Sequence, residues 1–236
     1  NLSFSTVYWN GLFGQIASAE DFGQLPATGR TIMVEYSSPN TNKPLHLGHI
    51  RNNLLGWSVA KLLEVCGHNV MKVNLVNDRG IHICKSMYAW KVLGNGETPA
   101  SSGKKGDHLV GDYYVAFNNL YKKEVDELVA GGMTKEEAEK NAPSLKAAQE
   151  MLFKWENGDA EVVELWKTMN GWVYEGFDKT YSDLGISFDR TYYESQTYLF
   201  GKALVQKGLD AGIFETQEDG SVWCDLTADG LDRKLL

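Results

Sequence analysis

The order of hydrophobic and polar residues between positions 31 and 76 predicts a strand, a loop, a helix and a second strand. Residues 31–36 and 70–76 are apolar, β-branched runs that are typical of strands. Between them, residues 37–44 are polar and rich in turn formers. Apolar residues at helical spacing follow, which are Leu47, Ile50, Leu54, Leu55, Val59, Leu62 and Leu63. A helix that ends near Gly67 would complete a βαβ unit with two parallel strands.

Beyond residue 76 the pattern predicts mainly helices. Helical spacing of apolar residues recurs in residues 81–90, 107–131, 144–156 and 159–184, and a turn-rich loop fills residues 93–106. The aromatic residues of these stripes are expected to lie in a core. The sequence therefore predicts an α/β fold, a Rossmann-like parallel sheet that carries an α-helical insertion.

After the helical block, the pattern predicts a return to the sheet. Residues 190–195 are expected to form a strand and residues 201–209 a short helix. Residues 214–224 predict a hairpin with an Asp-Gly turn.

Composition narrows the class of protein. The chain has 236 residues with a formal net charge of −8, 43% hydrophobic residues and 23% charged residues, which is usual for soluble globular proteins. The acidic balance argues against nonspecific nucleic-acid binding by bulk charge. No apolar run reaches the roughly 20 residues that span a bilayer, and no signal peptide is evident. The three cysteines show no paired spacing. We therefore expect a cytoplasmic protein without a membrane partner.

The polar loop after the first strand is the strongest candidate for chemistry. Ligands of parallel sheets bind beyond the carboxyl ends of the strands, where this loop lies. The loop leads into a helix N-terminus, which favours anions. His46 and His49 are three residues apart in the first turn, Gly48 leaves room for a flat ring against the backbone, and Lys43 adds positive charge. This combination predicts a site for a polyphosphate and a purine.

Other interpretations of these residues remain open. His46 and His49 are a possible metal pair, but no third ligand is near in sequence, so no protein-bound metal is predicted. The same histidines are also possible helix caps without chemistry. Asp78, at the end of the second strand, is a candidate for binding a ribose or a substrate amine, or for capping the helix that starts near Ile81.

Residues 34–51 resemble a known signature. They contain Ser-Ser-Pro-Asn, Lys-Pro and His-Leu-Gly-His in this order. This long match is similar to the first signature of the class I aminoacyl-tRNA synthetases, and its first parts are specific to the arginyl-tRNA synthetases. The resemblance extends over about residues 31–236 and is strongest in residues 34–51.

The resemblance implies a reaction and a set of site residues. It implies ATP-dependent ligation of L-arginine to tRNA(Arg) through an arginyl-adenylate, with ATP and Mg²⁺ as the substrate complex. The residues implied in catalysis are Lys43, His46 and His49. The residues implied in ATP binding are Lys43, His46, Gly48 and His49. The residues implied in arginine binding are Glu35, Ser38, Asn40 and His49.

The resemblance also implies a division of the chain. Residues 1–29 correspond to the end of an N-terminal tRNA-binding domain, whose last strand residues 1–4 resemble, and a linker. Residues 30–92 form the first half of the catalytic domain. Residues 93–187 form a helical insertion like the family's connective peptide, and residues 188–236 return to the catalytic domain.

Departures from the family pattern leave alternatives open. The second class I signature, Lys-Met-Ser-Lys-Ser, is absent. We therefore expect this chain to be a partial catalytic domain that does not aminoacylate alone. Glu194 and Ser195 are expected either to face the site or to be surface residues. The rival functions are a nucleotidyltransferase with a His-x-Gly-His site that makes a small-molecule adenylate or cytidylate, and a catalytically silent fragment that binds tRNA or another partner.

Overall fold

A parallel sheet of three strands positions the loop described above. In the computed structural model, which describes residues 2–218 and 220–236, the sheet has the order β1-β2-β3. Its strands are β1 (Thr31–Glu35), β2 (Asn69–Val76) and β3 (Arg190–Tyr193). Thr31 pairs with Asn69, and Val73 pairs with Arg190, in parallel register. The predicted parallel pair is thus confirmed, and β3 extends it.

The helix α2 (Leu47–Val65) connects β1 to β2, as the periodicity predicts. It packs closely at Gly56, where an added Cβ would lie only 2.3 Å from Tyr36 Cγ. Its larger apolar residues, among them Leu55 and Leu62, are exposed to solvent. The helix was therefore predictable from its apolar spacing, but the apolar stripe does not mark the side that packs on the sheet.

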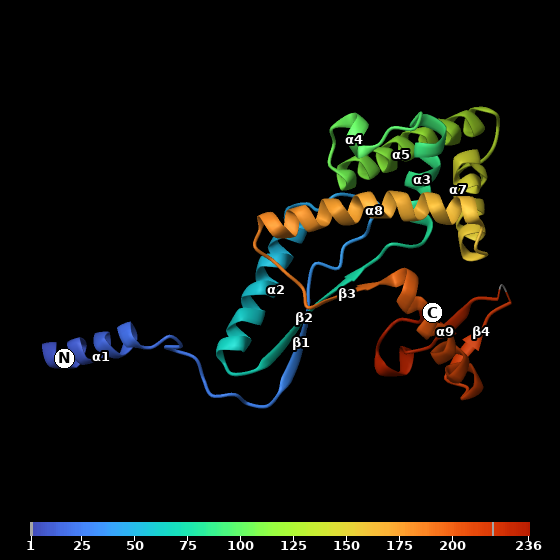
Figure 1. Ribbon diagram of the computed structural model, residues 1–236. Helices are drawn as coiled ribbons and strands as arrows, with labels where there is room; N and C mark the ends of the chain where they lie inside the picture. Colours follow the sequence, from blue (N-terminus) through green and yellow to red (C-terminus); the bar gives the residue numbers. More distant parts are fainter. Residues whose placement is uncertain (1, 219) are drawn as a thin grey trace.

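Six helices form a layer beside the sheet (Figure 1). They are α3 (Ile81–Leu93), α4 (Pro99–Ser102), α5 (Gly106–Ala130), α6 (Lys135–Asn141), α7 (Pro143–Glu156) and α8 (Ala160–Asp183). Fully buried apolar residues of α3, α5 and α8, such as Met87, Phe117 and Met169, make its core. The predicted stripes of α5 and α8 are confirmed, and the predicted loop 93–106 holds the single turn α4.

The C-terminal part departs from the prediction at its start. The helix α9 (Glu194–Asp210) begins directly after β3, so Glu194 and Ser195 belong to a helix and not to the predicted strand. The chain turns there because Asp78 accepts the Ser195 amide hydrogen. The predicted hairpin is present as β4 (Phe214–Thr216) and β5 (Val222–Cys224), but Asp219 of its predicted turn lies outside the described residues. A 3₁₀ turn (Thr227–Asp229) and β6 (Lys234–Leu235) follow.

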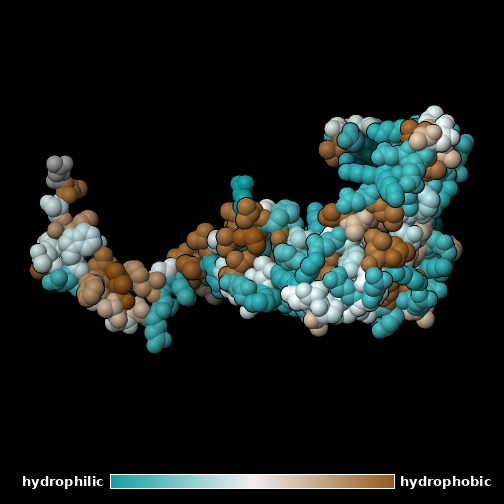
Figure 2. Space-filling view, turned by 90° about the horizontal axis from the view of Figure 1, so that it is seen from above, coloured by the Kyte–Doolittle hydropathy of each residue, from teal (hydrophilic) through white to brown (hydrophobic). Residues whose placement is uncertain are grey.

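The first described residues do not form the expected strand but lead irregularly into a helix. Residues 2–5 are irregular, and α1 (Thr6–Ser18) follows; Asn1 lies outside the described residues. The physical reason is local, because the Ser5 hydroxyl caps the Tyr8 amide and the Phe4 ring stacks on Tyr8 at 4.5 Å. This helix stands apart from the sheet (Figure 1), and its apolar side chains are exposed to solvent (Figure 2).

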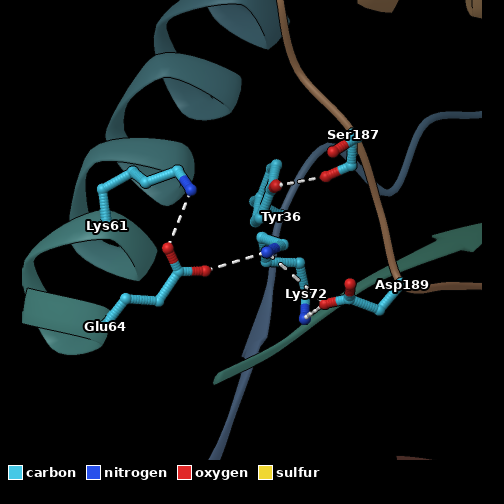
Figure 3. A network of polar contacts seen from close by, with 6 residues as sticks. All are labelled: Tyr36, Lys61, Glu64, Lys72, Ser187 and Asp189. Carbon is cyan, nitrogen blue, oxygen red and sulfur yellow. Dashed lines mark hydrogen bonds and ion pairs between the residues drawn. The ribbon is translucent and has the colours of Figure 1, made fainter. Parts of the chain in front are cut away.

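A polar network holds α2 against the sheet (Figure 3). Glu64 on α2 accepts hydrogen bonds from Lys61 (2.7 Å) and from Lys72 on β2 (2.9 Å). The backbone of Lys72 donates to Asp189 (2.7 Å), just before β3. The Tyr36 hydroxyl donates to the Ser187 carbonyl (2.9 Å), and burial raises the pKa of Tyr36 to about 12. The helix that carries the two histidines is therefore tied to β2 and to the segment that enters β3.

No helix in the described part of the chain is both long enough and apolar enough to cross a lipid bilayer.

Candidate functional site

The turn that follows β1 has an unusual backbone. Ser37 and Ser38 have φ angles of 71° and 42°, in the left-handed region that few residues other than glycine adopt. Two side-chain amides hold them there, since Asn52 on α2 accepts from the Ser37 amide (2.7 Å) and Asn74 on β2 accepts from the Ser38 amide (3.0 Å). The turn is thus anchored to α2 and to β2.

The helix α8 closes the same turn from the other side. The Ser37 hydroxyl and the Tyr181 hydroxyl share a hydrogen bond of 2.6 Å, and both residues are buried. Burial raises the pKa of Tyr181, so this phenol stays neutral. The helical layer therefore contacts the candidate site directly through α8.

The predicted arginine-binding pair lies at the end of β1. The carboxylate of Glu35 is exposed, and it accepts a hydrogen bond of 2.8 Å from the Ser38 hydroxyl. That hydroxyl also accepts the Leu75 amide hydrogen at 3.2 Å. Ser38 therefore orients Glu35 and links it to Leu75 of β2. The second carboxylate oxygen of Glu35 makes no hydrogen bond within the described residues.

The next residues run alongside the end of β2. Asn40 forms a parallel bridge with Asn77, whose amide donates to the Pro39 carbonyl (2.9 Å). The Thr41 amide donates to the Asn77 carbonyl (3.1 Å). Asn40, the third predicted arginine contact, is therefore held at the carboxyl edge of the sheet.

The two predicted catalytic histidines cap the start of α2 together. The Gly48 amide donates to Nδ1 of His46 (3.1 Å), and the His46 amide donates to Nδ1 of His49 (3.2 Å). The ring centroids are 4.0 Å apart. A Cβ at Gly48 would lie 2.8 Å from Cε1 of His46, so glycine is needed for this arrangement.

These caps determine which nitrogen of each ring carries the hydrogen. In a neutral imidazole one nitrogen accepts and the other donates. Because backbone amides donate to both Nδ1 atoms, both hydrogens must reside on Nε2. Burial, then the charges of His46 and Lys43, lower the pKa of His49, which favours this neutral form. Each ring can therefore cap the helix and still donate a hydrogen bond to a ligand, because its Nε2–H remains available.

Stability is expected to fall as the pH drops below the ordinary histidine value. The pKa of His49 is lower in the folded protein than in the unfolded chain, so the unfolded chain binds its proton first. The contribution of His49 to stability is therefore complete above about pH 6.5 and is lost as the pH falls through that value. Urea denaturation at about pH 7.5 and about pH 5.5 measures this, and His49→Gln should reduce the pH-dependent loss. An identical loss in the variant would contradict this origin.

Asp78 is a buried junction and not a helix cap. It is 1% exposed, and its carboxylate accepts from the Tyr174 hydroxyl (2.8 Å), the Ser195 amide (2.8 Å) and the Ser195 hydroxyl (2.7 Å). Its carbonyl accepts from Trp166 and Asn170 on α8. Gly80 occupies the N-cap position of α3 instead. Asp78 thereby joins β2, α8 and α9, and its carboxylate is engaged by protein donors.

Sequence reasoning missed the residues that support the turn. Asn52, Asn74 and Tyr181 contact Ser37 or Ser38, but none of them belongs to the recognised signature. A signal existed for Asn74, a polar residue between the apolar Val73 and Leu75, and the structure shows it 2% exposed. Tyr181 gave no such signal, because an aromatic residue in a helical stripe is usually core.

Metal-ligating groups are not gathered at the site. Within residues 2–218 and 220–236, no cluster of three or more His, Cys, Asp or Glu side chains has a geometry that would hold a metal ion. The histidine pair has its Nδ1 atoms occupied by backbone donors. Lys43 has no carboxylate within ion-pair distance in the described chain, so its charge is available to a ligand.

Comparison with known proteins identifies the family. Residues 15–228 match the family described as "tRNA synthetases class I (R), catalytic domain". The arginine–tRNA ligases of Bacteroides thetaiotaomicron and Porphyromonas gingivalis are 60% and 56% identical to the chain over its whole length. The chain spans 40% of the length of these curated relatives.

Solved structures agree on the fold. The arginyl-tRNA synthetase of Thermus thermophilus superposes with a TM-score of 0.65 and 22% identity, covering 96% of this chain and 35% of its own. That of Plasmodium falciparum superposes with a TM-score of 0.62 and 18% identity, covering 89% and 32%. Because the family match covers most of the chain, the chain belongs to the class I arginyl-tRNA synthetase catalytic-domain family, as residues 34–51 indicated.

Proposed function

We propose that the protein containing this chain ligates L-arginine to tRNA(Arg) through an arginyl-adenylate. In this proposal the chain supplies contacts to the ATP phosphates and one side of the arginine pocket. The observation that carries it is the reciprocal cap of His46 and His49, which leaves two neutral Nε2–H donors beside each other at a helix N-terminus. This arrangement supports phosphate binding more than metal binding, since the two Nδ1 atoms are occupied.

The ATP contacts follow from the charges around this cap. His46 and His49 would donate hydrogen bonds to the phosphates as negative charge builds on the bridging oxygen. Lys43 would neutralise the phosphates, and Gly48, whose missing side chain leaves room for the His46 ring, would pack on the adenine. Phosphoryl chemistry of this kind depends on positioning and charge neutralisation by the protein. MgATP is the expected substrate complex.

The arginine contacts would come from the turn after β1. A guanidinium group presents a planar fork of donors that suits a carboxylate, and Glu35 offers one with an oxygen left over after its bond to Ser38. Ser38 and Asn40 would bind the α-amino and carboxylate groups. The arginine carboxylate would then attack the α-phosphate with loss of pyrophosphate. The 2′-hydroxyl of the terminal adenosine of tRNA(Arg) would then attack the arginyl carbonyl, and the acyl–phosphate bond would break with release of AMP.

Glu35→Gln is expected to weaken binding of a non-hydrolysable arginyl-adenylate analogue by about 2 kcal/mol, or roughly thirtyfold. The reason is loss of a charge-assisted pair, since the amide keeps the shape but not the charge. Isothermal titration calorimetry of this chain with the arginyl analogue and with a citrullyl analogue measures it. The affinity for the neutral citrullyl analogue should change little. Glu35→Gln should therefore reduce the preference for the arginyl analogue and not the affinity for both analogues.

Matched controls decide between the candidate functions. Glu150→Gln changes an exposed carboxylate on α7 and should leave binding unchanged. His49→Ala should weaken the binding of both analogues, because both carry the phosphate.

A preference for cytidine nucleotides would support the small-molecule nucleotidyltransferase instead. If the wild-type chain binds no nucleotide, the remaining candidate function is a catalytically silent fragment that binds tRNA or another partner.

A further inference from the structure

A chain of hydrogen bonds that starts on β2 orients the carboxylate of Glu35. The Ser38 hydroxyl accepts the Leu75 amide hydrogen at 3.2 Å. Because a carboxylate only accepts, the same hydroxyl donates its one hydrogen to Oε1 of Glu35, 2.8 Å away. The direction of the Glu35 side chain therefore depends on where Ser38 is held.

The buried side chain of Asn74 fixes the backbone of Ser38 to β2. Ser38 has a φ of 42°, a conformation that costs free energy for a serine and persists only where neighbouring groups hold it. Its amide donates to Oδ1 of Asn74 at 3.0 Å and lies 3.1 Å from the Tyr36 carbonyl within the turn. Asn74 is 2% exposed, so water competes little for this bond. Without Asn74, the serine could relax towards a common backbone conformation and turn its hydroxyl away from Glu35.

The helix α8 supports the same turn from the helical layer. The Tyr181 hydroxyl lies 2.6 Å from the hydroxyl of Ser37, the neighbour of Ser38, which also has a left-handed φ of 71°. Tyr181 and Asn74 line one small cavity between α8 and the sheet. Burial raises the pKa of Tyr181, and hydrogen bonds from Ser37 and from Asn74 oppose that rise. Tyr181 thus contacts both the residue beside Ser38 and the residue that holds Ser38.

We propose that Asn74 and Tyr181 are positioning residues for the arginine substrate. They set the direction of the Glu35 carboxylate, and through it the preference for a guanidinium group over a neutral group of similar shape. The proposal rests on the proposed function, because it takes Glu35 as the guanidinium contact. Paired hydrogen bonds between a guanidinium and a carboxylate need the two groups to face each other, so a carboxylate without its support loses much of the interaction. Neither positioning side chain has to touch the substrate.

Binding titrations of this chain test the proposal. Asn74→Leu removes the acceptor of the Ser38 amide and leaves a side chain of similar size. Isothermal titration calorimetry with the arginyl-adenylate and citrullyl-adenylate analogues gives the ratio of the two affinities. We expect this ratio to fall about tenfold in Asn74→Leu and about threefold in Tyr181→Phe, which loses only the hydroxyl. The affinity for the citrullyl analogue should change little, because its neutral group forms no ion pair with Glu35.

A double-mutant cycle shows whether Asn74 acts through Glu35. The Glu35→Gln variant has already lost the charge that favours the arginyl analogue. Adding Asn74→Leu to it should therefore change the ratio of affinities by less than about twofold. A further tenfold fall in this background would overturn the proposal, because Asn74 would then act by another route.

A matched control and a second variant keep the test decisive. Asn69→Leu makes the same substitution at the start of β2, where the Asn69 side chain donates to the Thr31 hydroxyl at 3.1 Å, and should show the wild-type ratio. Urea denaturation shows whether each variant is folded. If Asn74→Leu does not fold, Tyr181→Phe decides, and an unchanged ratio in that variant overturns the proposal.

The outcomes separate positioning from a structural role. An unchanged ratio in folded Asn74→Leu, or an equal loss of affinity for both analogues, would overturn the proposal. If Glu35→Gln lowers the ratio and Asn74→Leu does not, the proposed function stands and only the positioning fails. If the wild-type chain shows no preference for the arginyl analogue, the arginine contact of the proposed function fails, and the positioning proposal falls with it.

Discussion

Asp78→Ala is expected to lower the free energy of unfolding by about 3–5 kcal/mol. The carboxylate is 1% exposed and accepts three hydrogen bonds, two from Ser195 and one from Tyr174. Alanine would leave these donors buried without an acceptor, and each such loss costs about 1–3 kcal/mol before water enters the space. Urea denaturation followed by tryptophan fluorescence measures the change.

Two further variants make the Asp78 result specific. Asp78→Asn keeps one acceptor for the Ser195 amide, and the two hydroxyls can turn to accept from the new amide, so a smaller loss is expected. Asp126→Ala removes an exposed carboxylate on α5 and should change stability by less than about 0.5 kcal/mol. A loss below about 1 kcal/mol in Asp78→Ala would mean that water reaches the donors and that this junction is not closed.

Gly56→Ala is expected to destabilise the protein by about 2–3 kcal/mol, although alanine is the better helix former. A Cβ at this position would lie 2.3 Å from Cγ and 2.4 Å from Cβ of Tyr36. The ring cannot move away easily, because its hydroxyl bonds to Ser187 and it packs on Phe188 with centroids 4.8 Å apart. The helix α2 would have to shift away from β1.

A matched glycine gives the opposite sign. Gly171 lies inside α8, and a Cβ there would meet nothing within 4 Å. Gly171→Ala is therefore expected to stabilise the protein by about 0.5–1 kcal/mol through helix propensity alone. Chemical denaturation of both variants under the same conditions compares the two effects. Equal stability of Gly56→Ala and wild type would show that α2 and β1 are less tightly packed than described.

Local patterns account for the parts of the fold that sequence analysis predicts well. The strands at residues 31–36 and 70–76 and the stripes of α5 and α8 follow directly from apolar spacing. The histidine loop also lies at the carboxyl end of β1, as a βαβ unit requires. In each case, the residues that determine the element lie within it or within the adjacent element in the sequence.

The predictions that fail at Asp78 and at the start of α9 involve contacts between residues that are far apart in the sequence. The sequence alone does not decide whether Asp78 binds a ligand or caps a helix, because its partners Tyr174 and Ser195 lie 96 and 117 residues further along the chain. The same contact ends β3 early and starts α9 at Glu194. The first residues differ from the prediction for the reverse reason, which is local: residues 2–4, where the family resemblance implies a strand, are irregular and lead into a helix that Ser5 caps and a stacked ring pair supports.

The paired left-handed serines have a consequence for how a ligand would be received. Such backbone conformations store roughly 1–3 kcal/mol each, and persist only when the surroundings hold them. Here Asn52, Asn74 and Tyr181 do so through hydrogen bonds within the protein itself. The loop therefore has little conformational entropy left to lose, and its rigidity is set during folding. A ligand that binds at this edge should therefore meet a rigid loop and should not require the loop to close over it.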